Sequence, residues 1–488
     1  MRAPHEIYFS RIEVVVVSFG LIDEWEPRIG RLTSWTMSQT AVTAAAGAPI
    51  HPVPPSHQQE AYLRAAQRNQ SAGFRFSRLC LQAFDFHSPL DADALTRTID
   101  AFLRRHDTFR CWFSEEPDGS IARHVVDPAI ISMTPTTHGD MDSASAIREH
   151  IQNETPGPFS WDCFTFGAIE WEGGFTLYGA IDHLDTDGIS QALTCTELIT
   201  LYMNEAFGLD TGLPEVGSYI EYCDHERTVS AALTRQAPQV CRWVELLQAN
   251  GGVLPGFPLP LGGESEDHTR SALLTMSVFS EDDAQRFEDV CRAHDSNMTA
   301  GLMAVAALAS YEFSGCTEYL GMTPKSTRAP GPALNSVGWF TSLIPVPITV
   351  GADATFTSIV GPAAESYAAG KELTDVSLHR VLELVEPDDG IDVAPGWSVP
   401  MVSYVDVRKL PGVDVFDAIN GCLYGNRGSS EEVFMWINRF RDQTSMTLLF
   451  PDTDEAHAAL PRYTDALRTI MATIARSGDY RPTVLALT

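Results

Sequence analysis

Two aromatic-rich runs on either side of a pair of glycines constrain the fold of this chain more than any other feature. Residues 164–171 and 175–182 are separated by Glu172-Gly173-Gly174, and glycines supply the backbone angles of the tight turns that join antiparallel strands. The pattern predicts a β-hairpin. The second run leads directly into Asp182-His183-Leu184-Asp185-Thr186-Asp187-Gly188, and the spacing of apolar residues over 189–206 predicts a helix after it. A histidine is therefore expected at the end of a buried strand, where functional side chains are common.

Strands and helices alternate in both halves of the chain, which predicts a mixed α/β (α+β) architecture. In the first half we expect a helix at 57–68 and a strand at 74–86. In the second half we expect a strand at 272–279 and helices at 281–294 and 299–313. The predicted organisation is a lead-in or tail at 1–50, a first lobe at 51–210 that carries the histidine, a connection at 211–270 and a second lobe at 271–488.

The composition sets limits on partners and compartment. Among the 488 residues, 33 are Lys or Arg and 64 are Asp or Glu, so the net charge is −31. This charge argues against nucleic acid as a partner and against simple electrostatic docking on an anionic membrane. No apolar run has the length of a transmembrane segment, although a transient membrane contact stays open. The nine cysteines form no C-x-x-C pair, which favours free thiols in a reducing cytoplasm.

The segment around His183 lacks residues that several known types of site require. An EF-hand loop that began at His183 would need a Glu where Thr194 stands, and a serine nucleophile elbow would need a Gly where Ala192 stands. The sequence also has no Walker loop and no G-x-G-x-x-G. We therefore expect no metal and no resident cofactor. The ordinary pKa of histidine, about 6.5, suits proton transfer at neutral pH, but spacing alone leaves open a histidine with no such role.

The segment from Asp182 to Gly188 resembles the H-H-x-x-x-D-G motif of the condensation-domain and chloramphenicol-acetyltransferase-like superfamily, with Asp182 in place of the first His. Other segments match that family in the same order: Leu90-Asp91 to Phe113, Thr327-Arg328, Val337-Gly338-Trp339-Phe340, Leu343-Ile344-Pro345, and residues 376–381. A closer resemblance is to the mycobacterial polyketide-associated acyltransferases that acylate trehalose. It covers most of the chain and includes Val53-Pro54-Pro55-Ser56, Trp161-Asp162-Cys163-Phe164 and Phe257-Pro258-Leu259-Pro260-Leu261-Gly262.

This resemblance implies two acyltransferase-like lobes in one chain, with an active-site tunnel between them. His183 is then the general base that takes a proton from an acceptor hydroxyl as the oxygen attacks an acyl thioester. The implied donor is an acyl-CoA or the acyl carrier domain of a polyketide synthase, and it serves as a substrate. The implied acceptor is a sugar hydroxyl, with trehalose as the expected sugar.

The resemblance also assigns supporting roles. Asp187 and Arg328 hold the positions of a structural ion pair between the lobes, which would fix the His183 loop. The amide of Gly188 is a candidate donor to the oxyanion by position. The carboxylate at Asp182 would either orient His183 or lie exposed at the strand end.

Gly338, Trp339 and Phe340 are expected at the tunnel, with the two aromatic rings packed in the core beside it. Two other functions stay open. One is a free-standing condensation enzyme that forms an amide, and the other is a non-catalytic homologue that binds lipid or a carrier protein. The chain lacks the adenylation and carrier domains usually fused to peptide assembly lines, which favours the ester-forming enzyme.

Overall fold

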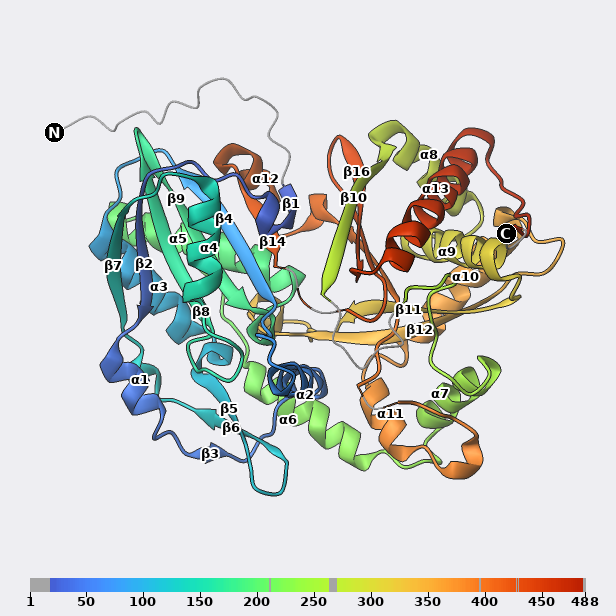
Figure 1. Ribbon diagram of the computed structural model, residues 1–488, viewed down its shortest axis with the longest axis horizontal. Helices are drawn as coiled ribbons and strands as arrows, with labels where there is room; N and C mark the ends of the chain where they lie inside the picture. The colour runs from blue at the N-terminus through green and yellow to red at the C-terminus, as the bar shows by residue number, and fades with distance from the viewer. Residues whose placement is uncertain are drawn as a thin grey trace.

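The N-terminal lobe is built on a seven-stranded sheet. A computed structural model describes residues 18–209, 212–262, 270–394, 396–426, 428 and 430–485, and it has two lobes side by side (Figure 1). The strand order of the sheet is β1 (Ser18–Leu21), β14 (Cys422–Gly425), β4 (Leu79–Phe86), β9 (Gly174–Asp182), β8 (Phe164–Trp171), β2 (Arg31–Met37) and β7 (Met133–Asp140). β8 and β9 form the predicted hairpin, and they are antiparallel. The strand expected at 74–86 begins only at Leu79.

Helices cover both faces of this sheet. α3 (Ala92–Arg105) and α5 (Gly188–Phe207) share a core with the side chains that one face of β4, β8 and β9 presents. On the other face, Ile147 and Ile151 of α4 (Ala144–Glu154) pack with Tyr178. A three-stranded sheet, β3 (Ile50–His51), β6 (Ile121–Val125) and β5 (Cys111–Glu115), completes the lobe with α1 (Gln39–Ala45) and α2 (His57–Ser71).

Residues of the expected lead-in belong to this lobe. β2 lies between β8 and β7, and its Trp35 is fully buried opposite Phe166. The indole nitrogen of Trp35 donates a hydrogen bond of 2.7 Å to Thr96 on α3. The lobe therefore starts well before residue 51. A short strand with polar neighbours offers little local signal, because its burial is created by strands more than a hundred residues away. Residues 1–17 lie outside the described part of the chain.

The C-terminal lobe combines four helices with a second sheet. The sheet order is β10 (Ser271–Ser280), β16 (Gln443–Pro451), β15 (Phe434–Arg439) and β13 (Met401–Asp406), and its helices are α8 (Glu281–Ala293), α9 (Met298–Ser314), α10 (Phe356–Lys371) and α13 (Asp454–Ser477). These elements share one apolar core. β11 (Glu318–Ser326) and β12 (Thr341–Thr349) form a separate antiparallel pair. α6 (Tyr219–Ala232) and α7 (Pro238–Ala249) lie in the connection, and α11 (Leu378–Leu384) packs with α7.

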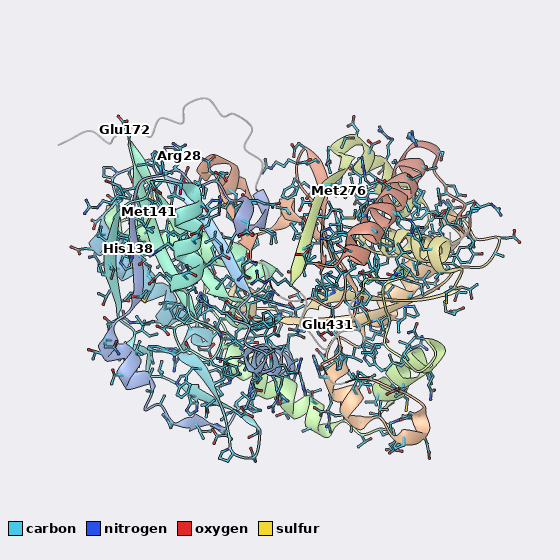
Figure 2. The ribbon with its side chains drawn as sticks, viewed as in Figure 1. Arg28, His138, Met141, Glu172, Met276 and Glu431 are labelled. Carbon is cyan, nitrogen blue, oxygen red and sulfur yellow. The ribbon has the colours of Figure 1, made fainter. Side chains whose placement is uncertain are left out.

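The chain crosses from the C-terminal lobe to the N-terminal sheet and back. After β13 it passes through α12 (Val413–Phe416) to β14, which pairs with β1 and β4, and it then returns to β15. Val413, Phe416 and Leu423 of this excursion are buried in the N-terminal core. In Figure 2, Glu431, which lies on the return segment, is near the middle of the molecule between the lobes. The two lobes are therefore interlocked by main-chain pairing.

Eight short 3-10 turns connect these elements in the described residues: η1 (Ile22–Glu24), η2 (Asp107–Arg110), η3 (Pro128–Ile130), η4 (His183–Asp185), η5 (Pro332–Asn335), η6 (Pro387–Asp389), η7 (Val407–Lys409) and η8 (Asp417–Ile419). Among those same residues, no helix combines the length and the apolar character that crossing a bilayer requires. The turn η4 follows β9 directly and carries the motif histidine at its first position.

Candidate active site

His183 is held by its backbone and leaves its ring nitrogens free. The amide of His183 donates a hydrogen bond of 2.7 Å to the carbonyl of Arg78, just before β4. The imidazole packs on the indole of Trp339, with ring centroids 4.2 Å apart. Its Nδ1 is buried and has no hydrogen-bond partner. The side chain is only partly buried, so the ring keeps an open edge, and Nε2 is the nitrogen that a substrate hydroxyl can reach.

The surroundings of His183 keep its ring neutral. Burial lowers the pKa of His183 to about 4, and the positive charge of Arg78 acts in the same direction. The carboxylate of Asp187 opposes both effects. A neutral imidazole at physiological pH can accept a proton, which is the state that a general base requires.

Asp187 and Arg328 form a buried ion pair across the two lobes. The guanidinium of Arg328 donates two hydrogen bonds to the carboxylate of Asp187, at 2.8 and 2.9 Å. The two side chains are only 2% and 7% exposed. The carboxylate also accepts the amides of Ser190, at 2.8 Å, and Phe340, at 3.0 Å. Each oxygen thus accepts two hydrogen bonds, which leaves Asp187 no free position for proton transfer and favours its expected structural role.

Ser190 is a member of this network that the sequence reasoning missed. Its hydroxyl accepts hydrogen bonds from Arg328, at 2.6 Å, and from the amide of Gly338, at 3.0 Å, and it donates to the carbonyl of Gly338 at 2.8 Å. Ser190 therefore ties the first turn of α5 to the segment 337–340. A local pattern places Ser190 in the first turn of α5, three positions after the capping Asp187, but its contact with Gly338 forms only when the lobes pack.

Neither expectation for Asp182 describes its position. The side chain is fully buried, so the exposed alternative is wrong. Its Oδ1 accepts the amide of Leu184 and its Oδ2 accepts the hydroxyl of Ser77, both at 3.0 Å. Since Nδ1 of His183 has no partner, Asp182 fixes the backbone of the turn and not the imidazole. Burial raises the pKa of Asp182 to about 6.

Asp185 is a second buried acid that the sequence reasoning passed over. Its Oδ1 accepts the hydroxyl of Thr108 at 2.7 Å, and its Oδ2 accepts the thiol of Cys163 at 3.4 Å. Burial raises its pKa to about 7. These contacts anchor η4 to the turn that follows α3, and they add a third fixed point to the His183 loop.

Gly188 borders open space at the start of α5. A Cβ placed on Gly188 would meet no atom within 4 Å, and the residue is exposed. The first amides of a helix have no acceptor inside the helix, and they attract negative charge. The position is thus compatible with the expected donor to an oxyanion, and it leaves room for a substrate to approach the backbone.

The segment 338–340 forms the wall beside the histidine. Trp339 contacts His183 and also meets Tyr62 of α2 edge-on, with ring centroids 5.5 Å apart. Phe340 lies deeper, under the guanidinium of Arg328 at 4.5 Å. A Cβ on Gly338 would lie 2.5 Å from the ring of Tyr219, so only glycine fits there. Of the three expected tunnel residues, Trp339 touches the histidine, while Gly338 and Phe340 belong to the packing behind it.

Comparison with known proteins places this geometry in a family. The model of the condensation domain matches residues 56–389. Trehalose-2-sulfate acyltransferase PapA2 of Mycobacterium tuberculosis is 37% identical over 93% of this chain and 96% of its own length. The chain belongs to the condensation-domain family. A second relative from the same organism, 2'-acyl-2-O-sulfo-trehalose (hydroxy)phthioceranyltransferase PapA1, is 34% identical over 95% of this chain and 89% of its own length.

Solved structures of condensation-domain proteins share the fold. The PapA2 acyl transferase superposes with a TM-score of 0.88 at 34% identity, over 94% of this chain and 100% of that structure. The first condensation domain of the calcium-dependent antibiotic synthetase gives a TM-score of 0.65 at 15% identity, over 86% of this chain and 96% of its own, which supports the shared architecture alone. The expected two-lobed fold is confirmed, and the protein is an acyltransferase of the condensation-domain family.

Proposed function

We propose that this protein transfers a fatty or polyketide acyl group from a thioester to a hydroxyl of a sugar, and that the sugar is trehalose. The state of the His183 imidazole supports this proposal most strongly. The ring is neutral, its Nδ1 has no partner, and it is held between a turn of the N-terminal lobe and Trp339. The names of PapA1 and PapA2 support the choice of trehalose as acceptor, because both refer to sulfated trehalose.

The reaction needs one group that accepts a proton and one group that donates a hydrogen bond to the oxyanion. Nε2 of His183 takes the proton of the sugar hydroxyl while that oxygen forms a bond to the thioester carbonyl carbon. The tetrahedral intermediate collapses with cleavage of the carbon–sulfur bond, and the imidazolium returns its proton to the departing thiolate. The amide of Gly188 at the start of α5 is the candidate donor to the oxyanion. The protein itself forms no covalent bond to the acyl group in this scheme.

The imidazolium in this scheme is short-lived. No carboxylate accepts a hydrogen bond from Nδ1 of His183, and burial opposes a positive charge on the ring. The proton therefore moves on to the thiolate readily. The ring is oriented by its contact with Trp339 and by the backbone bond to Arg78.

The donor in this proposal is an acyl-CoA or an acyl carrier domain of a polyketide synthase, which brings its own pantetheine arm. Both present the same thioester to His183, so the chain needs no resident cofactor for this chemistry.

The test is a product assay with purified protein and labelled palmitoyl-CoA. Trehalose, trehalose 2-sulfate, glucose and an amine panel serve as acceptors, and mass spectrometry identifies the products. We expect an ester of trehalose or of its sulfate that depends on His183. An amide product would support the free-standing condensation enzyme instead. If the folded protein forms no product at all, the result would support the non-catalytic homologue.

A further inference from the structure

Arg78 places a cation beside the catalytic histidine without a carboxylate to neutralise it. Its carbonyl accepts the amide of His183 at 2.7 Å, and its own amide donates to the hydroxyl of Tyr62 at 2.9 Å. The backbone amide and the carbonyl of Arg78 are therefore both fixed next to the His183 turn. The side chain is only partly buried. No carboxylate among the described residues forms an ion pair with its guanidinium, although the chain holds 64 acidic residues against 33 basic ones.

The guanidinium of Arg78 lies at the boundary between the lobes. Its central carbon is 5.9 Å from the ring centroid of Phe76, in the N-terminal lobe, and 6.0 Å from that of Phe434, on β15 of the C-terminal lobe. A Cβ on Gly428, in the segment that returns from β14 to β15, would lie 3.5 Å from its Nε. The two aromatic faces and Gly428 orient the guanidinium. Among the described residues, the one hydrogen bond that Arg78 donates comes from its backbone amide, so its planar side-chain donors can serve an anion.

Two acids of the turn are already engaged. Asp182 accepts the hydroxyl of Ser77 and the amide of Leu184, and Asp187 is saturated by Arg328, Ser190 and Phe340. A cation that lies beside the base and has no carboxylate partner in a strongly acidic protein is suited to a negative group that arrives with the substrate. Arginine matches sulfate and phosphate particularly well, since its fork donates two parallel hydrogen bonds.

We propose that the guanidinium of Arg78 binds a sulfate or phosphate ester group carried by a substrate, and thereby positions that substrate against His183. Two sources offer this chemistry: a sulfate on the sugar acceptor, and a phosphate on the CoA or phosphopantetheine arm of the donor. This inference rests on the proposed function for the identity of the substrates. It also gives the anion a second effect, because a bound anion offsets the positive charge that faces His183 and makes the ring a stronger base.

The experiment compares matched ligands with and without the anion. Calorimetric binding is measured for trehalose 2-sulfate against trehalose, and for coenzyme A against pantetheine, with the wild type, Arg78→Gln and Arg78→Lys. The control variant is Arg462→Gln, whose guanidinium also lies over an aromatic ring, 5.8 Å from the centroid of Phe313, but on the surface of α13 in the C-terminal lobe. Steady-state kinetics with the same acceptors and palmitoyl-CoA, or with palmitoyl-N-acetylcysteamine, supply KM and kcat.

We expect Arg78→Gln to weaken binding of the anionic member of one pair by about ten- to a hundredfold, the range of a charged hydrogen-bonded contact. The neutral member of that pair should bind unchanged, Arg78→Lys should recover part of the loss, and Arg462→Gln should match the wild type. The affected pair identifies the source of the anion. Equal losses for both members of each pair, or no loss at all, would overturn the inference.

Failure of the proposed function gives a different pattern. If the wild type binds an anionic probe through Arg78 but makes no ester with any sugar, the acceptor assignment fails and the role of Arg78 stands. If the wild type makes the ester and Arg78→Gln keeps the same KM for every substrate, the role of Arg78 fails and the function stands.

Discussion

The guanidinium of Arg328 and the carboxylate of Asp187 join the two lobes beside the His183 turn, through parallel hydrogen bonds of 2.8 and 2.9 Å. Asp187 also caps the helix that follows the turn, and it accepts the amide of Phe340. One carboxylate therefore sets the positions of His183 and of the wall beside it.

Removal of either partner of this pair should destabilise the fold. In Asp187→Ala or Arg328→Ala the remaining buried charge loses its partner, and we expect a loss of about 3–5 kcal/mol in the free energy of unfolding. Chemical denaturation measures it. The surface pair Arg97–Glu205 is the control, because solvent screens such a pair and Arg97→Ala should leave the free energy of unfolding close to the wild-type value. Wild-type stability in both Asp187→Ala and Arg328→Ala, together with lost activity, would show a chemical role instead.

His183→Ala should abolish acyl transfer and leave the fold intact. Loss of a general base lowers kcat by about 10²- to 10⁴-fold, whereas the fold should persist because the residue is only partly buried and its Nδ1 has no hydrogen-bond partner. The measurement is initial rate alongside circular dichroism. His138→Ala is the matched control, since His138 lies on β7 at the outer side of the N-terminal lobe (Figure 2), where its ring bonds to Ser34. Full turnover by a folded His183→Ala protein would remove the general-base role.

The activity should persist to unusually low pH for a histidine-dependent enzyme. Burial and Arg78 lower the pKa of His183 to about 4, with Asp187 opposing them, so the ring stays neutral until the pH falls toward that value. We expect kcat/KM to decline only below about pH 5. In Arg78→Gln the decline should begin at higher pH, because removal of the cation favours the imidazolium. A decline centred on pH 6.5 in the folded wild type contradicts this prediction.

The stability that the buried histidines contribute should fall on the same acidic side, so folding must be followed in the same samples. Burial also lowers the pKa of His57 to about 3 and that of His379 to about 4. Between pH 6.5 and 4 the unfolded chain therefore binds more protons at these histidines than the folded chain does. The contribution of the three histidines to the free energy of unfolding decreases as the pH falls through this range. Circular dichroism at each pH shows which points belong to the folded protein.

Restoring the family motif at Asp182 should harm this protein. The site is fully buried and fitted to a small acceptor of two hydrogen bonds, so we expect Asp182→His to lose about 1–3 kcal/mol through overpacking. Asp182→Asn should be tolerated, because its amide group can keep both contacts. Burial raises the pKa of Asp182 to about 6, so the stability that its protonated form contributes is lost as the pH rises from 4 to 6. Asp182→Asn should therefore gain relative to the wild type over that interval, which thermal melts at several pH values can measure.

Gly188→Ala should lower activity without lowering stability. A Cβ at this exposed position meets no protein atom within 4 Å, so the melting temperature should match the wild type. We expect a reduced kcat/KM, because the new methyl group occupies the space in front of the helix start. Gly167→Ala is the contrasting variant, since its Cβ would fall 2.2 Å from the ring of Tyr178 and should destabilise the sheet. Unchanged kinetics in Gly188→Ala would show that substrate does not pass there.

The local part of the site was predictable from the sequence. The hairpin turn at Gly173-Gly174, the strand end at His183 and the helix after Asp187 follow from short-range patterns, and the structure contains all three. The Asp187–Arg328 pair was reached only through resemblance to a family, because its members are separated by 141 residues. No local pattern could reveal that Ser77 meets Asp182 or that Ser190 meets Gly338, since those contacts exist only after the lobes have packed.

The pairing of β14 with β1 and β4 has a consequence for the order in which the chain matures during synthesis. The N-terminal sheet lacks a strand until residues 422–425 have left the ribosome, so a nascent chain that already carries His183 still has an open edge along β4. A fragment that stops before this strand would expose that edge to other chains. Catalytic competence and protection from aggregation therefore arrive together, late in translation.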